Sequence, residues 1–233
     1  MGDRKKSDTF AAEKLRNMIV ANMNLHEVYA DLMGEMKKLD WKRDALIHKA
    51  VGVLRKSNDF PASVVYDYQM QTSKNQYIIY FYQEQPMAPV LAGYLCVLFD
   101  DSKRYIIKWT DKGTPEILIL TSHFLQRYKE RFLKLPELTA NEVAVRFLSR
   151  NRTLRIMPVD ERINKRIKEY GEFAGEGFLA PDGFCFKLSG EETIDGADPI
   201  RISFFTTFMP LSEMSDTQRD AIFEECVKDL NYL

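Results

Sequence analysis

The chain has 233 residues, of which 45% are hydrophobic and 29% are charged, as is typical of a globular protein with a substantial core. No apolar run approaches the ~20 residues that a membrane-spanning helix requires. The charged residues 1–8 lack the apolar segment of a secretory signal, and the three cysteines lie far apart without metal-ligand spacing. We therefore expect no membrane contact and a reduced, cytoplasmic setting.

The net charge of −1 hides a separation of charge along the chain. Residues 123–168 carry 12 Lys and Arg against 5 Asp and Glu, whereas residues 169–233 carry 4 against 14. The basic segment favours RNA, another phosphate-containing molecule or an acidic protein as a partner. The alternative is that it packs beside the acidic C-terminal segment. Because the whole chain is nearly neutral, we do not expect tight, non-specific binding of nucleic acid.

The first 58 residues are expected to be helical. From Phe10 to Met33, apolar residues recur at intervals of three and four, as an amphipathic helix requires. A second helix is predicted from about Lys42 to Lys56. Its inward face would consist of Leu46, Ile47, Ala50, Val53 and Leu54. His26 and His48 have no partner at ligand spacing and are interpreted as structural or surface residues.

After Phe60-Pro61 the sequence period changes to two, which indicates strands. The predicted strands are residues 63–72, 76–83, 91–99, 104–110 and 116–121. Ser73-Lys74-Asn75 forms the first hairpin turn, and the later connections are too short for crossover helices. This part of the sheet should therefore be antiparallel.

A helical insertion and a second set of strands complete the chain. Helices are predicted at residues 122–133, 139–149 (capped by Thr139), 159–170 and 215–230. Strands are predicted at residues 172–179, 184–188 and 200–208. The turn Ala180-Pro181-Asp182-Gly183 joins the first two of these strands.

The fold class is α+β, with N-terminal helices, a mostly antiparallel sheet with a helical insertion in the middle, and a C-terminal helix. We divide it into a helical N-terminal region, 1–58, and an α+β core domain, 59–233.

The helix predicted from Ser122, taken as its N-cap, carries the residues most suggestive of chemistry. At 100° per residue, its polar residues fall within an arc of about 100°. These are His123, Arg127, Glu130 and Arg131. The apolar residues of the neighbouring arc are Phe124, Leu125, Tyr128, Phe132 and Leu135. Tyr128 is accordingly interpreted as a core residue.

His123 at a helix N-terminus, one turn before Arg127, should be a neutral imidazole near pH 7 that can accept a proton. The guanidiniums of Arg127 and Arg131 match phosphate oxygens. A base beside two fixed cations is what cleavage of RNA by its own 2′-hydroxyl needs. The alternative is that the arginines pair with Glu130 or the acidic C-terminal segment while His123 only caps the helix.

Hydroxyl groups on the late strand could complete such a site. Ser203, Thr206 and Thr207 lie on strand 200–208, and adjacent threonines would place one hydroxyl on each face of the sheet. The sequence contains no metal-ligand grouping, phosphate loop, nucleophile elbow or dinucleotide fingerprint. Any activity is therefore expected to need no metal or cofactor.

A strand followed by a Ser-His-x-x-x-Arg-Tyr-x-x-Arg helix and later by a Thr-containing strand resembles members of the barnase/EndoU/colicin/RelE-type superfamily. These are metal-independent ribonucleases common among toxins and phage-encoded proteins. The resemblance covers residues 116–149, and more loosely the order of elements to residue 208. It implies that His123 is the helix histidine, Arg127 and Arg131 are the basic positions, and Thr206 or Thr207 is the late hydroxyl. Unlike this family, the chain has a long helical N-terminus and an acidic C-terminal helix.

Three functions follow as hypotheses. The first is a metal-independent endoribonuclease or related phosphodiester-cleaving protein. The second is a non-catalytic binding or assembly protein that keeps the same scaffold and uses the basic segment 123–168 for a partner. The third is a helix-mediated oligomer, suggested by surplus apolar residues in the N-terminal helix. These residues include Met18, Met23, Met33 and Met36.

Overall fold

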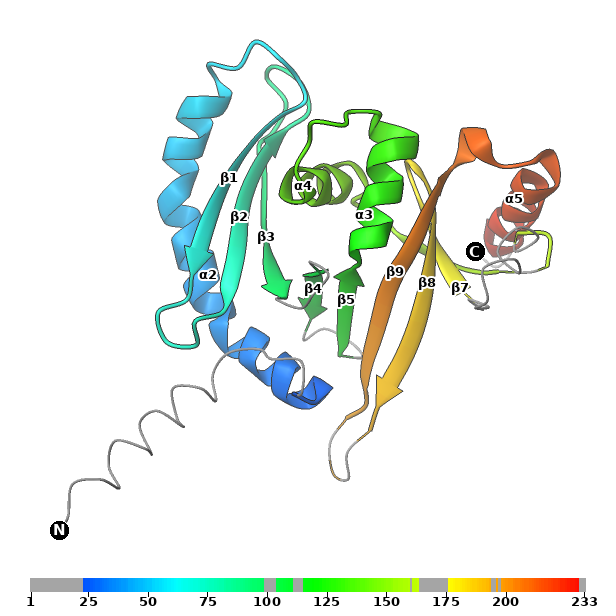
Figure 1. Cartoon of the computed structure of the whole chain (residues 1–233), viewed down its shortest axis with the longest axis horizontal. Helices are drawn as coiled ribbons and strands as arrows, with labels where there is room; N and C mark the ends of the chain where they lie inside the picture. Colours follow the sequence, from blue (N-terminus) through cyan, green and yellow to red (C-terminus); the bar gives the residue numbers. More distant parts are fainter. Residues whose placement is uncertain are drawn as a thin grey trace. The chain divides into compact units, whose positions relative to one another are not determined.

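The computed structural model describes residues 23–98, 104–110, 115–159, 161–163, 176–193, 196 and 198–230. The chain forms two compact units, one of residues 1–119 with 191–202 and one of residues 120–190 with 203–233 (Figure 1). This division differs from a boundary at residue 58, because the N-terminal helix packs against the strands that follow it. The α+β class, with an N-terminal helix, sheet strands in the middle and a C-terminal helix, is as predicted.

Helix α2 (Leu25–Leu54) runs without interruption through the first unit. Asn24 and Glu27 form a capping box at its start, in which each side chain accepts from the other residue's backbone N–H. A separate helix starting near Lys42 is therefore wrong. The reason is that no proline breaks the segment, and Gly34 alone costs only about 1 kcal/mol. Helix predicted before residue 23 lies outside the described residues.

The predicted inward face of α2 is correct only in part. Ala50 and Leu54 are buried against the sheet, while Leu46 and Ile47 are partly buried there. Val53, by contrast, is 49% exposed. His26 Nε2 donates to the Glu192 backbone carbonyl at 3.3 Å, which fits a structural role.

Five strands belong wholly or mainly to the first unit. They are β1 (Ala62–Gln69), β2 (Gln76–Gln83), β3 (Leu91–Leu98), β4 (Arg104–Thr110) and β5 (Glu116–Leu120). The β1–β2, β2–β3 and β3–β4 pairs are antiparallel, as predicted. The predicted turn between β1 and β2 is confirmed. Met70 N–H donates to the Asn75 carbonyl at 2.9 Å, and Lys74 takes a left-handed φ of 66°.

Two carboxylates of α2 point toward the sheet. Glu35 is 6% exposed and accepts from Asn75 Nδ2 at 3.1 Å and from the Tyr77 hydroxyl. Asp31, one turn earlier, has a buried Oδ2 without a hydrogen-bond partner. Burial, and then the charges of Glu35 and Glu27, raise the pKa of Asp31. Asp31 is therefore a source of instability in this contact.

The second unit alternates helices and strands. Its elements are α3 (Ser122–Tyr128), η1 (Lys129–Leu133), α4 (Ala140–Arg150), β6 (Arg155–Pro158), β7 (Glu176–Ala180), β8 (Gly183–Glu192), β9 (Ile200–Pro210), η3 (Leu211–Glu213) and α5 (Asp216–Leu230). The first residues of β9 and the last of β8 belong to the first unit. Thr139 caps α4 as predicted, in a box with Glu142. The β7–β8 hairpin pairs Ala180 with Gly183 across the predicted turn.

Two features of the second unit depart from the predictions. Strand β6 pairs antiparallel with β7 where no strand was expected. The helix predicted at 159–170 is not formed at residues 161–163, which make a turn, and its remainder lies largely outside the described residues.

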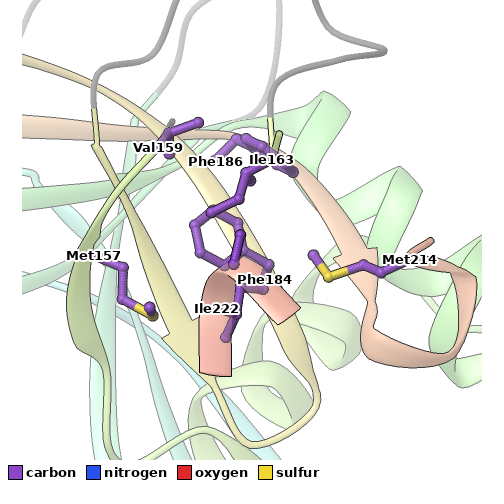
Figure 2. Packing of buried hydrophobic residues seen from close by; sticks show 8 residues of the cluster. Met157, Val159, Ile163, Phe184, Phe186, Met214 and Ile222 are labelled. Atoms are coloured by element: carbon purple, nitrogen blue, oxygen red, sulfur yellow. The ribbon is translucent and has the colours of Figure 1, made fainter. Parts of the chain in front are cut away.

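An apolar core joins β6, β8 and α5 in the second unit. Figure 2 shows the side chains that converge there, including Met157, Phe184, Phe186 and Ile222. All four are 6% exposed or less. Burial of this cluster fixes α5 on the β6–β8 strands. Among the described helices, none is long and apolar enough to cross a bilayer.

Candidate functional site

Helix α3 begins one residue earlier than its predicted cap implied. Thr121, not Ser122, is the N-cap, because Thr121 is extended and its side-chain oxygen accepts from Phe124 N–H at 3.2 Å. The same hydroxyl donates to the Phe205 carbonyl of β9 at 2.7 Å. One side chain thus starts the helix and holds it against the strand.

The apolar face of α3 is buried as predicted. Phe124 and Tyr128 are both 0% exposed and meet Phe147 of α4 and Phe208 of β9 edge to face. Centroid separations of 4.9–6.1 Å are the usual range for such aromatic pairs. Tyr128 is therefore a core residue, and the opposite side of α3 is left to carry His123 and Arg127.

The helix does not stay α-helical to its end. Lys129–Leu133 form the π-helical turn η1, which closes with a bond from Lys134 N–H to the Lys129 carbonyl at 2.8 Å. Lys134 then ends the turn in the left-handed conformation, with φ at 55°. Such turns are rare and are frequent at functional sites. Arg131 lies within this turn.

We call His123, Arg127 and Arg131 the basic face. His123 is exposed, and the side chains of Arg127 and Arg131 are 38% and 31% exposed. Partial burial, followed by the charges of Arg127 and Arg131, lowers the pKa of His123, while Glu130 opposes the shift. The direction of this shift is the one expected from the sequence, and partial burial is its first cause.

Both arginines have acidic neighbours. Arg127 Nη1 lies 3.3 Å from Glu130 Oε2, and Gln126 also donates to Glu130, at 2.8 Å. Arg131 Nε lies 3.9 Å from Glu213 in the acidic C-terminal segment, and its Nη1 donates to the Phe208 carbonyl at 3.1 Å. The pairing part of the alternative hypothesis is therefore present. These pairs are solvated, so each contributes little to stability.

The hydroxyl groups of Thr206 and Thr207 do not follow the expected placement of one on each face of the sheet. Phe205 and Phe208 both contact Phe124, although residues three apart on a regular strand face opposite ways. The alternation is therefore interrupted at Thr206 and Thr207, and one hydroxyl on each face does not follow. Thr206 Oγ1 donates to the Phe186 carbonyl of β8 at 3.1 Å. Thr207 is partly exposed.

The second unit holds all five residues, three on α3 and η1 and two on β9. Helix α3 lies beside β9 (Figure 1). The two ends of the α3–η1 segment bond to β9, Thr121 to the Phe205 carbonyl and Arg131 to the Phe208 carbonyl. Thr206 and Thr207 lie between those anchors. A cavity of about 380 Å³ lies elsewhere in this unit, between Leu211 and α5, and none of the five lines it.

Sequence reasoning missed a buried polar network behind the basic face. Asp182, which is 8% exposed, accepts from Tyr128 Oη at 2.6 Å and from Asn151 Nδ2 at 3.0 Å. Arg150 adds a two-pronged pair, with Nε and Nη2 each 3.0 Å from the carboxylate. The Pro-Asp-Gly turn was visible in the sequence, but its partners were not.

Metal binding finds no support in the described part of the chain, where no three His, Cys, Asp or Glu side chains cluster. The basic face instead offers guanidinium and imidazole donors, which suit an anion. The chain matches no protein-family model, and no curated protein or solved structure is significantly similar to it.

Proposed function

We propose that this protein binds RNA, and that the basic face contacts a phosphate of the RNA backbone. The observation that carries the proposal is the shared positive field of the three side chains. The three follow one another at intervals of four residues along α3 and η1, and the charges of Arg127 and Arg131 both lower the pKa of the His123 imidazole. The ribonuclease superfamily that residues 116–149 resemble takes the same class of ligand.

Arg127 is the first contact that we assign. Its guanidinium has five N–H donors, and its pair with Glu130 uses a 3.3 Å contact between side chains that are 38% and 44% exposed. Ion pairs of this kind contribute about 0–1 kcal/mol, so a phosphate can displace Glu130 at small cost. Arg131 already donates one hydrogen bond to the Phe208 carbonyl. It therefore contributes to phosphate binding more through its positive charge than through free N–H donors.

Cleavage of RNA is the second candidate, because a His123 imidazole with a lowered pKa can accept the 2′-hydroxyl proton. We rank it below binding. The Thr206 hydroxyl is engaged by the Phe186 carbonyl, and His123 is exposed on the outer side of its helix. Incubation with labelled RNA in EDTA separates the two candidates. Cleavage products that disappear in His123→Ala would favour the enzyme.

The binding proposal is tested with fluorescein-labelled single-stranded RNA by fluorescence anisotropy. Arg127→Gln should weaken binding and reduce the slope of log K against log salt by about 0.7. Arg219→Gln is the matched control, since Arg219 also pairs with a carboxylate three residues away and is 48% exposed. Equal affinities for the wild type and both variants would reject the proposal.

A further inference from the structure

The second half of α2 and the two residues after it, in the first unit, carry a second concentration of positive charge. Residues 37–56 hold seven Lys and Arg against two Asp. Arg43 contacts both aspartates, at 2.8 Å from Asp40 and 3.0 Å from Asp44. Arg43 offsets one of the two negative charges, and the segment keeps a net charge of +5 (seven minus two) that comes mainly from its lysines.

Three of these lysines extend from α2 toward β1 or the turn that follows it. Lys38 Nζ lies 3.4 Å from Thr72 Oγ1. Lys42 and Lys49 each place Nζ 5.4 Å from the centroid of a β1 tyrosine ring, Tyr68 and Tyr66 respectively. We call Lys38, Lys42 and Lys49 the lysine ladder. It follows about 16 Å of the helix axis.

The ladder is ordered before any ligand arrives. A lysine held over an aromatic ring loses part of its side-chain conformational entropy on folding. The further loss of entropy when a ligand binds is therefore smaller. It also lies along the edge of the sheet, because β1 has a neighbour on one side only among the described strands. Lysines at a sheet edge discourage pairing with another sheet. That role alone does not explain the aromatic residue beside them.

Trp41 stands next to the ladder on α2 and is 71% exposed. A large apolar ring in water among cations is suited to stacking on a flat, negatively charged partner. The apolar face of α2 is turned inward, where Leu32 and Leu39 are both 0% exposed. Trp41 is not part of this inward face.

We propose that Trp41 and the lysine ladder form a binding site for single-stranded nucleic acid. Trp41 stacks on a base, and the lysines contact the phosphates of neighbouring nucleotides. This combination of a stacking ring with a row of cations gives moderate, salt-sensitive affinity with little sequence preference, which fits a chain with a net charge of −1. The site is separate from the basic face and does not depend on it.

The test is fluorescence anisotropy with a labelled adenosine dodecamer RNA and the full chain. Trp41→Ala should weaken binding about 5- to 150-fold, and Trp41→Phe should recover most of the loss. Phe223→Ala is the matched control, because Phe223 is 68% exposed on α5. Circular dichroism melts of all variants should coincide, since each change is at an exposed side chain.

The lysines are tested through salt. The double variant Lys42→Gln/Lys49→Gln should lower the slope of log K against log salt by about 1.4. Lys228→Gln, a lysine 60% exposed on α5, should leave it unchanged. Three results overturn the site: no RNA binding, equal losses in Trp41→Ala and Phe223→Ala, or binding to phosphatidylserine vesicles in place of RNA. RNA binding that depends on Arg127 but not on Trp41 would reject this site and would support RNA binding by the basic face.

Discussion

Replacement of Asp182 by asparagine should strongly destabilise the second unit. The change keeps the shape of a residue that is 8% exposed but removes the charge that accepts from Tyr128, Arg150 and Asn151. The new amide N–H₂ must also face one of these donors. Breaking one partner of a buried pair costs about 3–5 kcal/mol, which corresponds to a loss of roughly 6–20 °C in Tm for a chain of this size.

Thermal unfolding followed by circular dichroism measures this loss. Tyr128→Phe should cost only about 1–2 kcal/mol, because Arg150 and Asn151 still satisfy the carboxylate. The two changes should be non-additive, as expected for residues in direct contact. Glu224→Gln is the control, since its carboxylate is 54% exposed despite a 2.9 Å pair with Arg162. A Tm for Asp182→Asn within 2 °C of the wild type would refute the network's role.

Four further changes have defined outcomes. Gly34→Ala should stabilise α2 by about 0.5–1 kcal/mol, because an added Cβ meets nothing within 4 Å. Gly183→Ala should destabilise the folded protein, because its Cβ would lie 2.4 Å from the Met209 carbonyl oxygen. Urea denaturation measures the free energy of unfolding of both variants. The pKa of Asp31 is raised, so folding stability falls as pH rises above 3.8 through its titration. Asp31→Asn should remove that fall and gain about 0.5 kcal/mol at pH 7, and an unchanged pH profile would contradict this. Arg127→Gln should raise the pKa of His123, since one of the charges that lower it is removed; histidine NMR titration would reveal a value that stays constant or falls.

Local patterns explain which elements were predictable. Thr139 and Glu142 stand three residues apart before an apolar run, and this spacing alone specifies a capping box. The hairpin turns at Lys74 and at Pro181-Asp182 were equally local. The choice between Thr121 and Ser122 as cap was not, because it is decided by the bond from Thr121 to the Phe205 carbonyl, 84 residues away.

The remaining features of the site depend on contacts that no local pattern encodes. Asp182 finds its partners 31 to 54 residues away. The π-helical turn at Lys129–Leu133 follows from an i to i+5 bond in a sequence that also suits an α-helix. The break in alternation at Thr206 is visible only through the two phenylalanines that share Phe124. The arc of His123, Arg127 and Arg131, in contrast, followed from helical periodicity.

The most direct test of RNA binding by the basic face is the NMR titration of the His123 ring with and without a single-stranded RNA dodecamer. The chain has three histidines, and His26, which belongs to neither proposed site, serves as the internal reference. A bound phosphate stabilises the imidazolium, so the account predicts that RNA shifts the His123 resonances and raises the pKa of His123 in the wild type. Arg127→Gln should abolish that rise. RNA that binds while the His123 titration stays unchanged would contradict the account.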